Sequence, residues 1–178
     1  MTVTLDDIKQ AQQRIQPYIH CTPILQSTQL NKLFTCELFF KADNMQKVGA
    51  FKARGACNAL FSMTQEVLAN GVITHSSGNH GAALAWAAAM RKASCTVVMP
   101  ENAPQAKKDA VLSYGATVVY CEPTMTAREG TVTRLIEQQG ARLVHPYDDD
   151  LIIAGQGTAT LETLAQLDKP ADVLMTPV

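Results

Sequence analysis

The feature that most constrains the fold is a regular alternation of strand and helix patterns in the second half of the sequence. Its members are the candidate strands beginning near Val72, Cys95, Thr117 and Leu143 and the helix patterns 79–92, 104–114 and 126–139. Pro104 suits a first helical position, where its missing N–H is not needed. Gly115 and Gly140 suit helix ends, because glycine adopts the left-handed conformation at little cost. Strands and helices at this spacing are typical of a parallel α/β sheet with right-handed crossovers.

The segments on either side of this alternation are less regular. Thr4, followed three residues later by Asp7, predicts a capped helix. A second short helix is expected over residues 25–33. Residues 36–41 are predicted to form a buried strand, and residues 172–178 a strand with nothing after it. A parallel strand at the end of a chain leaves one face of its sheet uncovered, so we expect the native chain to continue beyond this last segment.

Composition argues against several classes of protein. Of the 178 residues 47% are apolar, and the formal net charge is -1, so the chain can bury a core and carries no basic surface for nucleic acid. The five cysteines form no CxxC pair and the histidines have no metal-ligand spacing, which argues against disulfides and a metal site and favours a cytoplasmic protein. No signal-peptide pattern is present, and no apolar run approaches the ~18 residues that span a membrane.

The first motif that could carry chemistry surrounds Lys52. This lysine directly follows Phe51 and lies between Gly49 and Gly55. Amine chemistry requires a lysine that is partly desolvated, so that its neutral form is accessible near neutral pH, and an aromatic neighbour favours that state. For an isolated Phe-Lys pair, an ordinary surface lysine at the start of a helix is the more common explanation.

The second motif is Ser76-Ser77-Gly78-Asn79-His80-Gly81, which lies between a candidate strand and an alanine-rich helix. Such a turn directs several backbone N–H groups at one point and is a ready anion site. The structural alternative is a well-made helix cap, since serine and asparagine are preferred there. A weaker glycine turn, residues 153–159, is expected to lead from a loop into another helix. The GxGxxG and GxxxxGK[ST] fingerprints and the G-x-S-x-G elbow are absent, which argues against a dinucleotide site, a P-loop and a serine hydrolase.

Together, Gly-Ala-Phe-Lys-Ala-Arg-Gly-Ala and Ser-Ser-Gly-Asn-His-Gly resemble the lysine and substrate-loop motifs of fold-type-II pyridoxal-phosphate (PLP) enzymes. The similarity is greatest to the serine/threonine dehydratases and serine racemases. It continues through Val98–Pro100, Lys107-Lys108, Tyr114–Ala116, Val119–Pro123, His145-Pro146 and Ala154–Thr158. It therefore extends over nearly the whole chain.

The resemblance implies a role for each matching residue. Lys52 would form the Schiff base with the cofactor and act as the base on one face of Cα, with Phe51 packed beside the pyridine ring. Asn79 would hydrogen-bond the phenolic oxygen of PLP. The substrate carboxylate would be held by the loop Ser76, Ser77, Gly78, Asn79 and His80. Ser77 would also serve the opposite face of Cα, and Arg128 resembles an arginine near the substrate in the racemases.

The resemblance also implies the reaction and the architecture. PLP stabilises a Cα carbanion. Elimination of a β-hydroxyl as water would leave an enamine that hydrolyses to a 2-oxo acid and ammonia, whereas reprotonation from the other face would give racemisation. We expect a small domain, residues 53–148, inserted in a large domain that comprises residues 1–52 and begins again at 149–178. The glycine-rich loop for the PLP phosphate would follow the last strand and is absent here. Ala50 and Val48 stand where the family has serine and threonine.

The activity expected from these features is serine/threonine ammonia-lyase. Serine or hydroxyaspartate racemase or dehydratase is the near alternative. An alternative of another class is a truncated, catalytically silent domain. In the complete protein we expect an amino-acid substrate and a homo-oligomer.

Overall fold

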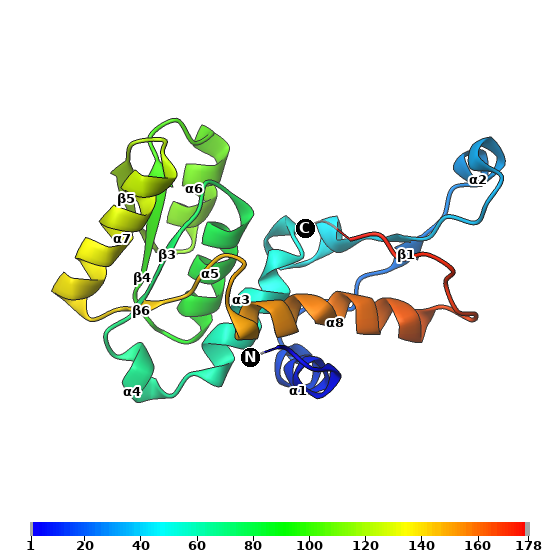
Figure 1. Cartoon of the computed structure of the whole chain (residues 1–178), viewed down its shortest axis with the longest axis horizontal. Coiled ribbons are helices and arrows are strands. Elements are labelled where there is room, and N and C mark those ends of the chain that lie inside the picture. Colours follow the sequence, from blue (N-terminus) through cyan, green and yellow to red (C-terminus); the bar gives the residue numbers. More distant parts are fainter. Residues whose placement is uncertain (1, 177–178) are drawn as a thin grey trace.

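A four-stranded parallel sheet lies at one end of the computed structural model, which describes residues 2–176 (at the left of Figure 1). Its members are β3 (Val72–His75), β4 (Cys95–Pro100), β5 (Thr117–Cys121) and β6 (Arg142–Leu143), in the order β5-β4-β3-β6. The register places Val72 opposite both Cys95 and Arg142. The predicted α/β class, with a parallel sheet flanked by helices, is confirmed.

Helices cover both faces of the sheet because successive strand residues point to opposite sides. Val97 packs into one core with α5 (Asn79–Met90) and α6 (Gln105–Ser113). Val98, the next residue, packs into the other core with α7 (Met125–Gln139). These three helices were expected. Gly140 takes the left-handed conformation directly after α7, with φ 67°, whereas Pro104 is the N-cap of α6 rather than its first residue.

The strand order contains one reversal, and this reversal locates the site. The chain moves outward from β3 through β4 to β5 and then returns through α7 to place β6 on the other side of β3. The carboxyl ends of β3 and β6 therefore lie at a topological switch point, where the chain segments that follow two neighbouring parallel strands run in different directions. In open α/β sheets, this is the usual position of a ligand crevice.

Three helices pack together beside the sheet unit: α1 (Leu5–Ile15), α3 (Lys52–Ser62) and α8 (Asp150–Gln166). The capping box predicted for α1 is present, with the Thr4 side chain and the Asp7 side chain bonding each other's backbone N–H groups. Residues 153–159 lie inside α8, so the prediction of a loop there is wrong. A Cβ added at Gly155 would lie 2.5 Å from the Cα of Gly55, so the two glycines allow α3 and α8 to touch.

An arm extends away from this helix group, at the right of Figure 1. It consists of β1 (Ile24–Leu25) paired antiparallel with β2 (Phe40–Lys41), and of α2 (Thr28–Phe34), which buries no residue. The buried strand predicted over residues 36–41 is wrong: only its last two residues pair, because β1 offers only two partners, and Phe40 is 44% exposed.

The remaining elements are short. They are η1 (Asp43–Met45), η2 (Lys47–Gly49) and α4 (Gln65–Leu68). The strand predicted over residues 172–178 is also wrong as far as the structure describes it. Residues 172–176 adopt no regular conformation, and residues 177–178 lie outside the described range.

Candidate active site

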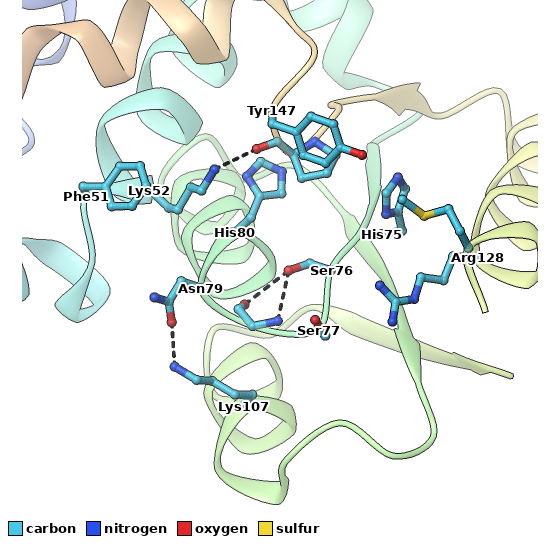
Figure 2. Close-up of a pocket in the computed structure, with 13 residues that line it drawn as sticks. Phe51, Lys52, His75, Ser76, Ser77, Asn79, His80, Lys107, Arg128 and Tyr147 are labelled. Atoms are coloured by element: carbon cyan, nitrogen blue, oxygen red, sulfur yellow. Dashed lines mark hydrogen bonds between the residues drawn. The ribbon is translucent and has the colours of Figure 1, made fainter. Parts of the chain in front are cut away.

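A cleft of about 490 Å³ opens at the carboxyl ends of β3 and β6, where the strand order reverses (Figure 2). Its walls come from the start of α3, the loop after β3, the first turn of α5, α6, α7 and the loop after β6. The lining residues are Phe51, Lys52, His75, Ser76, Ser77, Gly78, Asn79, His80, Lys107, Met125, Arg128, Pro146 and Tyr147. All eight residues that the sequence singled out therefore lie around one cavity.

Lys52 is the first residue of α3 and reaches into the cleft. Its Nζ donates a hydrogen bond to the carbonyl oxygen of Pro146 at 2.9 Å and lies 5.2 Å from the centre of the Phe51 ring. Burial lowers the pKa of Lys52 below the ordinary lysine value, because the charged form loses hydration. Among the described residues that line the cleft, none is a carboxylate that could restore the charged form. The lowered pKa makes the neutral amine of Lys52 more accessible, which suits amine chemistry.

The loop before Lys52 is held in an unusual conformation. Val48 has φ 55° and Gly49 has φ 68°; a β-branched residue rarely takes this left-handed conformation. The buried Gln46 ties the loop to His20. Its side-chain amide accepts from the N–H of His20 at 2.9 Å and donates to the His20 carbonyl at 2.7 Å. The position of Lys52 is therefore set by the whole segment.

The first turn of α5 presents backbone donors to the cleft. The Oγ of Ser76 accepts from the N–H groups of Gly78 at 3.1 Å and Gly81 at 3.0 Å, so the buried Ser76 side chain acts as a cap. Within residues 2–176, the N–H groups of Ser77, Asn79 and His80 have no hydrogen-bond acceptor. Unsatisfied donors at a helix N-terminus favour an anion. The loop is both a helix cap and a candidate carboxylate site.

Two histidines beside this turn are kept neutral. Burial, together with the charge of Lys52, lowers the pKa of His80 to about 3, and the neighbouring backbone of Val144 opposes this shift only in part. Burial also lowers the pKa of His75, and nearby His145 contributes to this shift. The rings of His75 and His145 meet edge to face at 5.4 Å.

The cleft carries positive charge without a compensating acid. Lys52, Lys107 and Arg128 line it, and its lining, as far as the chain is described, includes no aspartate or glutamate. The Nε of Arg128 is buried and has no hydrogen-bond partner within residues 2–176 (Figure 2). An anionic ligand would complete this arrangement.

Sequence reasoning missed a buried ionic cluster that holds α3. Arg54, two residues after Lys52, is fully buried and pairs with Asp43 at 2.8 Å and with Glu162 of α8 at 3.1 Å. Lys41 contacts Glu162 at 2.5 Å. Burial alone would lower the pKa of Arg54, but the hydrogen bonds and charges of Asp43 and Glu162 outweigh it and raise that pKa. The cluster thus links residues 41–43 and α8 to the first turn of α3.

Other cleft residues were also missed as site residues. His75 directly precedes the serine loop, and Lys107, Pro146 and Tyr147 come from segments far from either motif. These residues lie close to the two motifs because of the order of the strands in the sheet, and no local pattern in the sequence predicts that order. Within residues 2–176, no group of three or more His, Cys, Asp and Glu side chains is arranged to hold a metal ion.

The residues of the cleft fit PLP. Lys52, half-buried and with a lowered pKa, suits condensation with an aldehyde. The Phe51 ring lies beside it, and the Asn79 amide offers a donor to a phenolic oxygen. The surplus of cationic groups suits a ligand that carries phosphate and carboxylate charge.

Comparisons with known proteins agree with this fit. Residues 15–178 match the family model "Pyridoxal-phosphate dependent enzyme". The chain is 52% identical to serine racemase of Dictyostelium discoideum (99% of this chain, 54% of the relative) and 47% identical to beta-hydroxyaspartate dehydratase of Paracoccus denitrificans (98% and 55%). The crystal structure of T.th. threonine deaminase superposes with a TM-score of 0.85 at 44% identity (92% and 51%).

The chain spans about half the length of these relatives. Within residues 2–176, the helices are too short or too polar to cross a lipid bilayer. The motifs around Lys52 and Ser76, the fold and the matches all lead to the same family. The chain belongs to the pyridoxal-phosphate dependent enzymes of fold type II, and PLP is the cofactor of that family.

Proposed function

We propose that the whole protein removes the Cα proton of a hydroxy amino acid and eliminates its β-hydroxyl as water. The enamine that is released takes up a water molecule by hydrolysis and gives a 2-oxo acid and ammonia. One observation carries the proposal: the partly desolvated amine of Lys52 shares a cleft with the N–H groups of Ser77, Asn79 and His80, which have no acceptor among the described residues. PLP supplies the electron withdrawal that makes a Cα proton acidic. Serine racemisation is the near alternative, supported by the 52% identity to a serine racemase.

Each residue has a task in this proposal. The N–H groups of Ser77, Asn79 and His80 bind the substrate carboxylate, which fixes the direction of the Cα–H bond. The neutral amine of Lys52 takes the proton from one face. The hydroxyl of Ser77, exposed in the cleft, exchanges a proton at the opposite face. The side chain of His80 is buried and neutral, so it adds no charge to this turn.

Replacing Ser77 separates elimination from racemisation. In the whole protein loaded with PLP, we expect Ser77→Ala to reduce racemisation of either serine enantiomer by ~10²–10⁴-fold, the usual contribution of a general acid or base. Elimination from the enantiomer whose proton faces Lys52 should persist. Chiral chromatography of serine and a 2-oxo acid assay give the two rates. Ser113→Ala, at the end of α6 and outside the cleft lining, is the control. Racemisation as fast in Ser77→Ala as in this control would show that the Ser77 hydroxyl takes no part in proton transfer.

A β-hydroxyaspartate dehydratase is a second candidate, favoured by the surplus positive charge of the cleft. A second substrate carboxylate would give Arg128 the partner that its buried Nε lacks in the described chain. A dehydratase of this kind is also among the relatives, at 47% identity.

Arg128→Met tests this substrate. We expect kcat/KM for 3-hydroxyaspartate to fall about 10–100-fold, as for loss of a hydrogen bond to a charged group, and kcat/KM for serine to fall much less. Arg134→Met, an exposed residue of the same helix outside the cleft lining, should change neither value. Equal losses for both substrates would remove the reason for preferring a dicarboxylate.

We also propose the division expected from the sequence, with residues 53–148 as a small domain that closes on the remainder. The sheet with α5, α6 and α7 is a unit with its own two cores. The helix α3 contacts both this unit, through α5, and the other part, through α8. Its first residue is Lys52, so closure would occur at the amine. The homo-oligomer and the cytoplasmic location stay predictions.

A further inference from the structure

A hydrogen bond across the rim of the cleft connects α6 to the first residue of α5. The Nζ of Lys107 donates to the Oδ1 of Asn79 at 2.5 Å. Figure 2 shows the oxygen of Asn79 directed at Lys107 and the amide nitrogen directed away from it. Both residues line the cleft. The proposed function gives Lys107 no task, although it lies beside the residue expected to touch the cofactor.

The chemistry of the pair determines which way the amide faces. An asparagine side chain has an acceptor end and a donor end, whereas a lysine ammonium has donors only. Lys107 can therefore pair only with Oδ1, since a rotated amide would place N–H groups against the ammonium. With Oδ1 engaged, the N–H groups of Nδ2 are the part of the side chain left for a ligand.

We propose that Lys107 is a positioning residue that fixes Asn79 with its amide donors available to the phenolic oxygen of PLP. The inference rests on the proposed role of Asn79. An ionised phenolic oxygen needs a donor, and a carbonyl oxygen in the same place would repel it. Lys107 thus favours the ionised form of the cofactor's phenol by controlling the orientation of another side chain.

The chain offers a matched control in the next residue. Lys108 donates to the carbonyl oxygen of Glu101 at 2.6 Å and lies 5.1 Å from the centre of the Tyr120 ring. It has the same charge, belongs to the same helix and does not line the cleft. Lys108→Met therefore removes a neighbouring charge without touching Asn79.

The readout is the absorption spectrum of the lysine-bound cofactor in the whole protein, which needs no substrate. The ionised phenol absorbs in the visible range and the neutral phenol in the near ultraviolet. In Lys107→Met, we expect the ratio of visible to near-ultraviolet absorbance to fall about tenfold, as for a weakened hydrogen bond to a charged atom. Lys107→Arg, which keeps a donor, should restore most of the ratio, and Lys108→Met should leave it within twofold of the parent.

A second background separates positioning from simple charge. In Asn79→Ala, the Lys107→Met change should alter the ratio less than twofold, because no amide remains to be oriented. An equal fall in both backgrounds, or no fall in the protein that keeps Asn79, would overturn the inference while leaving the proposed function intact. Absence of any visible band in the unsubstituted protein would instead overturn the proposed function and this inference with it.

Discussion

Lys52→Ala should abolish the visible absorption of bound PLP in the whole protein and reduce turnover by at least ~10²–10⁴-fold, the contribution of one general base. The loss is expected because Lys52 is the lysine that lines the cleft beside Phe51, with a pKa lowered by burial. The variant should still fold, because the substitution removes one hydrogen bond, to the carbonyl of Pro146, and Lys52 belongs to no ion pair among the described residues. Spectrophotometric titration with PLP and a 2-oxo acid assay measure both effects.

Lys47→Ala is the control for this change. Lys47 lies five residues before Lys52, in η2, and does not line the cleft. It should keep the visible band and the turnover of the parent. A visible band of parental strength in Lys52→Ala would show that another amine carries the cofactor.

Arg54→Met should destabilise the fold by ~3–5 kcal/mol, the usual result of removing one partner from a buried ion pair. The substitution leaves Asp43 and Glu162 with Lys41 as the remaining cation of the cluster, although both carboxylates are largely buried. A typical domain has only about 5–15 kcal/mol of stability, so much of it would be lost. Urea denaturation followed by circular dichroism gives the free energy of unfolding.

Two further variants make this result specific. Lys9→Met removes the exposed pair with Asp6, whose side chains are 56% and 85% accessible, and should cost less than ~1 kcal/mol. Arg54→Lys keeps the charge but not the two-sided contact with Asp43 and Glu162, and should fall between the other two. A loss below ~1 kcal/mol for Arg54→Met would show that the cluster does not hold α3 in place.

Local sequence patterns were sufficient for the sheet and for much of the cleft. The capping pair Thr4 and Asp7 and the glycine after α7 act within a few residues of themselves, so their effects can be predicted from neighbouring letters. The regular spacing gave the strands and helices of the sheet unit. The resemblance of two motifs placed Lys52 and the loop at Ser76 in one site, and the structure brings them together.

The errors arose where a segment depends on distant partners. Gly155 and its neighbours look like a turn, but the glycines are there because α3 passes within contact distance at Gly55. Residues 36–41 have the composition of a buried strand, but β1 pairs with only two of them. Arg54 and Glu162 are 108 residues apart, and no local pattern connects them.

The most direct test of the central claim is chemical labelling of the PLP-loaded protein. Borohydride reduction fixes the cofactor to the lysine that holds it, and peptide mapping by mass spectrometry then identifies the residue. We expect the label on Lys52, the lysine with the desolvated amine at the meeting point of α3 and the loop after β6. A label on Lys41, Lys47 or any other lysine would contradict the assignment of this cleft as the cofactor site.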